Sequence, residues 1–550
     1  MRKTILCLLA GLAAWPLYAQ EEQVLQAALY LSGAASEEEI PADVIERVES
    51  ARMIRVNDPH LRAGVLLTDY QVACIRDYRA RSGDILSLDE LALVDGFSRE
   101  AVQALAPFLS LTSDRLPGQA DTARLRSTVL ARTTLKNIGF KGRVSAEKYR
   151  AGAAWRGSGG SFYADVTFRR HRILAGDFHT RWGQGLAAWT GFSMESLSTV
   201  DAFVRRSTGL SPVWSYAPES VHRGVAWEYS GTHVRAAAFA ARGREFGAHA
   251  DWLGRQGQIG LTALLADGSP AFSLDGRYYW RGALFAGELA CRDRSLALRT
   301  SARGTFRSGW KWALQGRLLP RRFIGKKNGE YAFAGGLDWQ SGRWVALSGR
   351  SGFGSSVRSM QASLTADASV LPVPGTDPRR FQLRVYGMWQ WQFSPVWLLD
   401  LRFTERYRNY EASRTDFRAD LKAASGPWLG TLRLEADRCG AWGFLGYLEG
   451  GRKTDVWAAY LRLTGFSVQE WSARIYCYER DAPGTFSVPA YNGRGVAVSA
   501  VGSCKLRLGR PSWPSLWRFL SLRGNLRAAC VLRAGQPPAP ALNLQLQCDL

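Results

Sequence analysis

The sequence predicts an α+β multidomain protein in which a small all-α domain precedes a large antiparallel β-barrel of the outer-membrane type. Three observations predict this class: a leader with the form of a secretory signal, helix-capping patterns up to residue 113, and alternating apolar and polar residues beyond it. We therefore assign residues 1–19 to a signal peptide, 20–113 to the helical domain, 114–123 to a linker and 124–550 to the barrel.

The leader has the three regions of a signal peptide. Arg2 and Lys3 form a basic start, residues 4–14 form an apolar core, and residues 17–19 offer a cleavage site. The apolar run is too short to span a bilayer and Pro16 interrupts it, and no later stretch is apolar enough for a membrane helix. The chain is therefore expected to leave the cytoplasm, and an α-helical membrane protein is excluded.

Charge is divided unevenly along the chain. The net charge is +23, or +21 without Arg2 and Lys3. Residues 20–115 hold 17 acidic and 9 basic residues, a net of −8, and contain no lysine. The remainder therefore holds 31 acidic and 60 basic residues, a net of +29. Such asymmetry indicates two units with different partners.

Start and stop signals predict the helices of the first unit. Thr68 and Ser87 each open a capping-box pattern, with Gln or Glu three residues later. Gly83 is placed to end the helix that starts at Thr68, and Gly96 to end the helix that starts at Ser87. Pro107 lies late in the last helix of the unit and should end or kink it. The Pro- and Gly-containing stretch after this helix is typical of a linker.

Period-two alternation predicts the strands of the second unit. It is clearest in residues 162–169, 381–393 and 397–408 and in the closing stretch "LNLQLQCDL". A soluble sandwich or β-helix would bury the apolar face, whereas an outer-membrane barrel turns it toward lipid around a polar lumen. The 64 aromatic residues and the arginines on polar strand faces favour the barrel. At roughly 20 residues per strand and turn, it would have about 20 strands.

The last strand resembles the assembly signal of outer-membrane barrels, except that it ends in Leu550 rather than an aromatic residue. Two regions carry a further resemblance. Residues 56–109 resemble the doubled helix-hairpin-helix of competence-type DNA-binding proteins. Residues 174–192 and 216–227 resemble a block in secreted Gram-negative proteins that join such a domain to an outer-membrane-type β-domain. This resemblance implies an outer-membrane location and contact with DNA, but no settled activity.

The second hairpin is the candidate nucleic-acid site. A DNA-binding hairpin carries Gly-apolar-Gly between its helices, so that backbone N–H groups can approach phosphate. The second hairpin here keeps the first glycine, a cap for the next helix and a cation for phosphate. Its residues are Gly96, Phe97, Ser98 and Arg99. The first hairpin, residues 67–69, has no glycine and is read as structural only.

The charge of the domain argues against the DNA-binding interpretation. Non-specific DNA binding rests on cationic side chains, and a net of −8 without lysine favours packing or protein contact instead. A local basic patch of Arg76, Arg79, Arg81 and Arg99 would restore the DNA-binding interpretation. Lyase chemistry through a Schiff base is excluded in this domain, because it needs a lysine.

The stretch "RWGQGLAAW" is the second candidate site. Its two glycines fit a loop lining a pore or ligand site, but they are more typical of a tight turn or bulge where a strand meets an inward-folded segment. Downstream, an arginine next to a glycine could form a buried ion pair with Glu219 that orients the loop, or both charges could be exposed. The residues singled out are Arg181, Trp182, Gly183, Gln184, Gly185, Arg223 and Gly224.

No catalytic or metal-binding pattern is found in the sequence. GxSxG and HExxH are absent, and the seven cysteines outside the leader are dispersed without CxxC. We expect no enzyme activity, metal or cofactor. The excess arginines of the barrel are assigned first to lipid phosphates or to an anion preference of the lumen, ahead of nucleic acid.

Three functional hypotheses follow from the sequence. The first is an outer-membrane barrel with a periplasmic helical domain and a binding or transport role, with double-stranded DNA as a candidate ligand. The second is a barrel whose acidic domain docks a periplasmic protein partner or plugs the lumen, without nucleic acid. The third is a secreted soluble β-rich protein. Outer-membrane lipid is the partner common to the first two.

Overall fold

The computed structural model describes residues 20–113 and 125–549, apart from gaps at 35–36, 41, 50, 52, 60, 136, 147, 158, 192–196, 255, 267, 307, 325–328, 342–358, 372–379, 455, 483–486 and 509–519. The expected signal peptide and linker lie outside the described residues.

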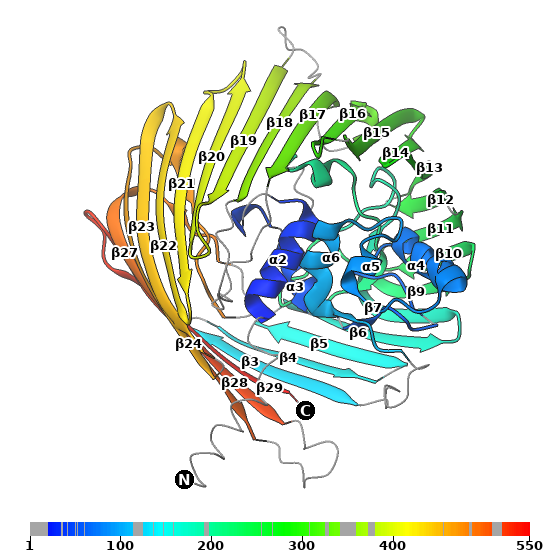
Figure 1. Cartoon of the computed structure of the whole chain (residues 1–550), viewed down its shortest axis with the longest axis horizontal. Coiled ribbons are helices and arrows are strands. Elements are labelled where there is room, and N and C mark those ends of the chain that lie inside the picture. Colours follow the sequence, from blue (N-terminus) through cyan, green and yellow to red (C-terminus); the bar gives the residue numbers. More distant parts are fainter. Residues whose placement is uncertain are drawn as a thin grey trace.

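Most of the described chain forms one closed antiparallel barrel (Figure 1). Its wall has 24 strands in the described ranges, more than the sequence estimate of about 20. The estimate was low because many turns are very short: Gly440 alone joins two of the strands. The sheet closes where the last strand pairs with the first, with Asp549 opposite Thr128. Closure leaves the wall without an open edge.

The wall strands, in chain order, are β3 (Arg126–Thr134), β4 (Ile138–Ser145), β5 (Tyr149–Arg156), β6 (Gly159–Phe168), β7 (His171–Arg181), β9 (His222–Ser230), β10 (Val234–Ala241), β11 (Glu245–Leu253), β12 (Gly257–Ala266), β13 (Ser269–Trp280), β14 (Ala283–Arg292), β15 (Ser295–Thr305), β16 (Lys311–Leu319), β17 (Glu330–Ser341), β18 (Ser359–Leu371), β19 (Arg380–Gln392), β20 (Trp397–Arg408), β21 (Arg414–Ser425), β22 (Trp428–Cys439), β23 (Ala441–Lys453), β24 (Trp457–Val468), β27 (Gly493–Arg507), β28 (Ser521–Arg533) and β29 (Ala539–Asp549).

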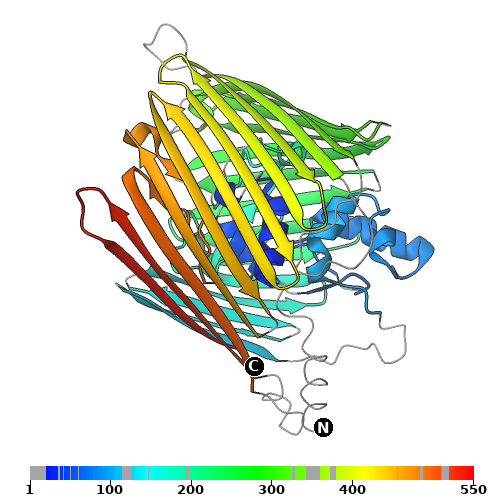
Figure 2. The ribbon, with the colours of Figure 1, turned by 60° about the vertical axis from the view of Figure 1, so that its left-hand side comes forward.

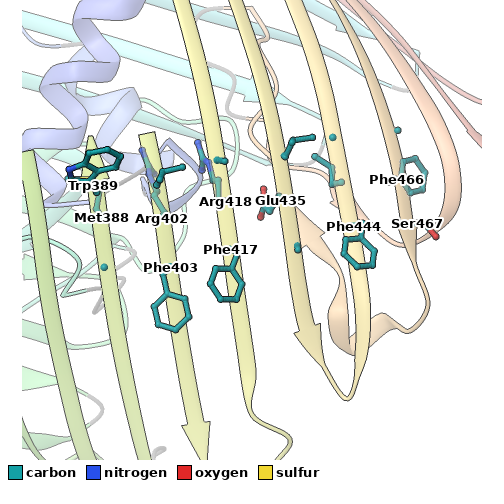
Figure 3. Close-up of a pocket in the computed structure, with 18 of the residues that line it drawn as sticks. Met388, Trp389, Arg402, Phe403, Phe417, Arg418, Glu435, Phe444, Phe466 and Ser467 are labelled. Atoms are coloured by element: carbon teal, nitrogen blue, oxygen red, sulfur yellow. The ribbon is translucent and has the colours of Figure 1, made fainter. Parts of the chain in front are cut away.

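The two faces of the wall have opposite chemistry. On β21 and β22 the apolar Phe417 and Leu434 are 49% and 59% exposed, whereas the neighbouring Arg418 and Arg433 are buried inside. Figure 3 shows the same alternation on β20 and β21, where the phenylalanines and arginines occupy successive positions. A soluble sandwich would bury the apolar face, so this arrangement identifies a barrel of the membrane-spanning type.

Two long insertions fold back into the lumen from the rim opposite the chain ends. Residues 182–221 join β7 to β9, and residues 469–492 join β24 to β27. The first packs its Val200–Phe203 turn against β15, β16 and β17. The short elements of the insertions and of the β16–β17 turn are η3 (Val200–Phe203), β8 (Gly209–Pro212), η4 (Trp471–Ala473), β25 (Ile475–Tyr476), β26 (Ala490–Tyr491) and α7 (Arg321–Ile324).

The N-terminal residues form a helical domain that lies within the barrel (Figure 1). Figure 2 shows the dark blue α2 and α3 behind the strands, while the lighter blue helices project at one end. No helix in the described ranges is long and apolar enough to cross a membrane. The elements of this domain are α2 (Gln20–Ser32), η1 (Glu37–Glu39), α3 (Ala42–Glu49), β1 (Ile54–Arg55), α4 (Asp69–Ser82), α5 (Leu88–Leu91), α6 (Arg99–Leu105), η2 (Ala106–Phe108) and β2 (Leu109–Ser110).

Most of the expected helix signals act at the helix ends, but Gly96 does not end the second helix, because α5 already ends at Leu91. Thr68 and Gln71 form the complete capping box of α4, and Gly83 follows its last turn with a positive φ of 88°. Ser87 caps α5, but the Glu90 carboxylate accepts a hydrogen bond from the preceding backbone N–H rather than from the cap residue. This second box is therefore only half formed, and α5 has just four residues.

Candidate functional site

The helical domain is attached to the barrel rim that carries the chain ends. Arg62 donates a hydrogen bond to the carbonyl of Arg169 in the β6–β7 turn, and Arg76 donates to the carbonyl of Gly231 in the β9–β10 turn. Both turns lie at the same end of the barrel as the C-terminus of β29, because the strands alternate in direction from β3. These contacts fix the outer part of the domain at this rim.

Deeper in the lumen, the domain presents an acidic turn to a group of wall arginines. We define this acidic turn as Glu37–Glu39, the η1 turn. The Glu38 carboxylate accepts hydrogen bonds from Arg418 at 2.8 Å, from Arg433, and from the backbone N–H of Tyr478 at 3.2 Å. Glu39 accepts from Arg384 at 3.2 Å. Charge-assisted bonds of this kind are about twice as strong as neutral ones.

Further acid–base contacts surround α3 and α4. Asp69 forms an ion pair with Arg235 of β10, so the negative charge of the first hairpin binds the wall. Glu46 lies 3.4 Å from the Lys141 ammonium of β4. Acidic side chains of the domain thus meet basic side chains of the lumen, which gives the interface electrostatic complementarity.

Burial and cationic neighbours act in opposite directions on the pKa of Glu38, and the lowering contributions together outweigh burial. Burial alone would raise this pKa, but Arg418 and Arg402 lower it to about 2. The pKa of Glu37 is also lowered, because Lys422 and the nearby arginines outweigh the raising effect of burial. The acidic turn is therefore charged at neutral pH although it is removed from bulk water.

Acidification is expected to release the acidic turn only near pH 2. Because the pKa of Glu38 is lowered, its contribution to docking is fully present above the ordinary value of 4.5 and is lost as the pH falls through about 2. If the seated domain closes the lumen, conductance across planar bilayers should therefore be the same at about pH 5 as at neutral pH, and should rise as the pH falls toward about 2. A rise completed between about pH 5 and pH 4 would show that Glu38 is not held by the arginines.

The "RWGQGLAAW" loop begins at the end of β7 and turns into the lumen. The Glu288 carboxylate of β14 accepts three backbone hydrogen bonds from it, from the N–H groups of Gln184 at 2.7 Å, Leu186 at 3.0 Å and Ala187 at 3.1 Å. Gly183 has a φ of +60°, and a Cβ there would lie 2.8 Å from a Glu288 oxygen. The glycine thus permits both the turn and the close approach of the carboxylate.

The aromatic and polar side chains of this loop are used for packing. Trp182 is buried and stacks on the His249 ring at 5.1 Å between centroids. The Arg181 and Arg205 guanidinium groups lie over the Trp189 ring at 5.4 and 5.1 Å. The structure therefore places this stretch as an inward turn anchored on Glu288, the geometry that glycines in such a position typically produce.

Arg223 pairs with Asp177 rather than with Glu219. Of the two alternatives left open by the sequence, the buried pair with Glu219 is not formed, and both Arg223 and Glu219 are exposed. The two residues are opposite each other in the β7–β9 register, and Arg223 Nε lies 2.6 Å from Asp177 Oδ1. Val225 points the same way and is 54% exposed, so the pair lies on the outer face of the wall. A Cβ at Gly224 would lie 2.1 Å from the Ala240 carbonyl oxygen of β10, so only glycine fits there.

The second hairpin is arranged around Gly96. Its φ is +82°, and its carbonyl accepts a hydrogen bond from the Gln71 side chain at 2.9 Å. Phe97 packs against the domain core, and Ser98 caps α6 by accepting from the N–H of Ala101. Arg99 is exposed at the start of α6.

The four arginines that would restore the DNA-binding interpretation as a basic patch do not form one. Arg79 pairs with Asp84 at 2.9 Å, and Arg81 pairs with Asp77 four residues earlier on α4. Arg76 is occupied by backbone carbonyls, one of them in the barrel. Arg99 alone of the four arginines makes no ion pair or hydrogen bond in the described part of the chain. The domain's own carboxylates thus neutralise Arg79 and Arg81, and only Arg99 remains available as a cation for DNA.

Metal or disulfide chemistry finds no support in the described residues. The seven described cysteines are all free thiols, and no group of three or more His, Cys, Asp or Glu side chains in the described ranges is placed to hold a metal ion. The pocket drawn in Figure 3, with a volume of about 1010 Å³, lies across the wall from β19 to β24. Its outward side is lined by exposed apolar residues such as Phe417, Leu434 and Phe444, which is the surface that faces lipid in a membrane barrel.

No protein-family model and no curated protein sequence matches the chain. Solved structures do match it. The P pilus usher (PapC) translocation pore is 9% identical over 78% of this chain and 98% of that chain, with a TM-score of 0.35. The PapC-PapD-PapK-PapG tip assembly intermediate from E. coli is 9% identical over 79% of this chain and 62% of that chain, with a TM-score of 0.45.

The outer membrane protein opdK from Pseudomonas aeruginosa is 10% identical, over 78% of this chain and 97% of that chain, with a TM-score of 0.28. The likeness is one of fold. At these identities and TM-scores the matches carry no argument about the location, ligand or function of this chain. The family expected from residues 56–109 and 174–192 is not matched, so it stays a prediction.

Proposed function

We propose that the protein is an outer-membrane transport barrel whose lumen is closed by its own N-terminal helical domain. The observation that carries this proposal is the acidic turn held deep in the lumen by Arg384, Arg418 and Arg433. A barrel of 24 strands is wide enough to enclose a plugged lumen, as barrels of about 22 strands do. The domain occupies the space that a solute would cross.

The interface supports a domain that can leave the lumen as a folded unit. The domain has its own apolar core, built around side chains such as Val48, Leu67 and Ile75. Tyr279 of β13, stacked on Tyr70 at 4.4 Å, is the one apolar barrel side chain among the described residues that packs against this core. The Arg206 guanidinium also lies over the Tyr30 ring at 5.2 Å. The remaining attachment is polar, and polar interfaces within a chain are typical of parts that move relative to one another.

The proposal places the rim with the chain ends in the periplasm. The N-terminal domain enters the barrel from this rim, where Arg62 and Arg76 bind the turns. The apolar outer face requires a bilayer around it. Cell fractionation tests the location: the protein should sediment with outer membranes and need detergent for release. Release into the periplasm or medium without detergent would instead support the secreted soluble hypothesis.

A periplasmic protein partner that controls the position of the helical domain is the second part of the proposed function. Leu86 and Leu93 flank α5 and are 67% and 82% exposed, so both side chains are accessible to an apolar surface of a partner. A periplasmic protein that binds this surface could withdraw the domain from the lumen. Photo-crosslinking from position 93 in intact cells should then trap a periplasmic protein. Crosslinks to barrel turns alone would argue against a partner there.

Contact with DNA rests on the Gly96–Arg99 hairpin, which resembles the phosphate-binding turn of helix-hairpin-helix domains. With the domain seated, Arg99 faces the interior of the barrel, so duplex contact requires the domain to move outward. Titration of the full chain with duplex DNA at several salt concentrations tests this. Salt-dependent binding that Arg99→Gln weakens would support it, and the absence of binding would remove DNA from the function.

A further inference from the structure

The helical domain fills the lumen only in part. A cavity of about 860 Å³ remains between helices α2, α5 and α6 on one side and strands β19–β28 on the other. We call this cavity the lumenal chamber. Lys453, Lys505 and Arg523 lie where β23, β27 and β28 reach the rim of the chain ends. The chamber therefore extends from the acidic turn toward this rim.

The lining of the lumenal chamber is strongly basic. It contains eight cationic side chains and three carboxylates, those of Glu37, Asp89 and Glu449. Glu38 and Asp420, which bind Arg433 from outside the lining, raise the acidic count only to five. Among the described residues, cations therefore outnumber carboxylates in and around this lining. The cations are Arg99, Lys422, Arg433, Lys453, Arg462, Arg480, Lys505 and Arg523.

Part of this lining is rigid. Arg462 and Arg480 both bind Glu449, at 2.7 and 2.8 Å, and lie over the rings of Tyr447 and Tyr460 at 4.1 and 4.4 Å. Guanidinium groups held in this way are oriented before any ligand arrives, which reduces the entropy cost of binding.

One buried donor in the lining lacks a partner. Asn525 of β28 is only 3% exposed, and its Nδ2 donates no hydrogen bond in the described part of the structure. A buried amide donor that is left without an acceptor destabilises the folded state. An acceptor inside the chamber would remove this destabilisation. Anionic oxygen is the acceptor that the surrounding charge favours.

We propose that the lumenal chamber binds small anionic solutes that carry carboxylate or phosphate groups. The chamber volume falls in the range of about 300–1,000 Å³ that is typical of small-molecule sites. This inference rests on the proposed transport function, because it names the class of solute that would enter the barrel from the periplasmic rim. Arg99 contributes to the site from the helical domain, so the site exists while the domain is seated.

Calorimetric titration of the detergent-solubilised full chain with citrate, and separately with inorganic phosphate, tests the inference. The double variant Arg99→Gln/Arg523→Gln removes one cation from each side of the chamber and should weaken citrate binding by about tenfold or more. Asn525→Ala should weaken it less. The matched control is Arg126→Gln/Arg143→Gln, which removes two cations from the cavity of 540 Å³ on the other side of the domain and should leave the affinity unchanged.

The outcomes test anion binding by the lumenal chamber independently of whether the helical domain closes the lumen. Binding that is lost only in the chamber variant supports the inference. No binding of citrate or phosphate by the unaltered chain, or equal weakening in both double variants, overturns it. Migration of each variant as a folded barrel on unheated gels shows that it is assembled. Because binding is measured with the domain seated, a barrel that never conducts would contradict the proposed function and leave the binding result intact.

Discussion

The variant Glu38→Lys is expected to open the barrel. It would place a cation against Arg418 and Arg433 and remove the acceptor of the Tyr478 N–H group. Breaking a buried ion pair by removing one partner costs about 3–5 kcal/mol, equivalent to a shift of about a hundredfold or more in the equilibrium between seated and released domain. The measurement is single-channel conductance in planar bilayers, where the variant should show frequent large openings that the unaltered chain lacks.

Asp95→Lys is the matched control for this prediction. Asp95 is on the same domain and undergoes the same change of charge, but it is exposed and forms no ion pair with the barrel among the described residues. Its variant should conduct like the unaltered chain. Equal opening in both variants would show that the overall charge of the domain matters and the acidic turn does not. A closed Glu38→Lys barrel would show that the turn does not hold the domain.

The variant Glu288→Ala is expected to destabilise the barrel by about 3 kcal/mol or more, because three buried backbone N–H groups would lose their acceptor. The carboxylate accepts from the N–H groups of Gln184, Leu186 and Ala187, so its removal detaches the inward loop at its base. The midpoint of urea unfolding in detergent measures this loss. Glu288→Gln keeps one carbonyl acceptor and should lose less.

Glu330→Ala provides the comparison for Glu288→Ala. Glu330 also lies in the lumen, where it binds Arg317 at 2.7 Å, but that guanidinium keeps Asp367 at 2.8 Å after the change. The cost should therefore be smaller than that of Glu288→Ala, which leaves three backbone N–H groups without an acceptor. Equal losses in the two variants would mean that the lumen responds to any missing carboxylate, and that the inward loop is not anchored specifically by Glu288.

The barrel class could be predicted because strand periodicity is local. Each strand places apolar and polar residues on opposite faces, so the alternation in residues 381–393 is visible without knowledge of its neighbours. The number of strands was underestimated because a turn as short as Gly440 leaves almost no gap in the pattern. The helix caps at Thr68 and Ser98 were likewise local and act as expected.

The candidate site could not be predicted in the same way, because it depends on contacts between distant segments. Glu38 meets Arg418 and Arg433, which lie 380 and 395 residues later, and only the closed barrel brings them together. The run of three glutamates and the arginines on strand faces were both visible in the sequence, but their pairing was not. The same applies to Arg223, whose partner Asp177 is set by strand register.

The central claim is that the helical domain closes the lumen of a membrane barrel. The most direct test compares the bilayer conductance of the full chain with that of a chain lacking residues 20–113, once both are shown to migrate as folded barrels. The account predicts a full chain that is closed most of the time and a shortened chain with a large, steady conductance. Equal conductance of the two chains would contradict it.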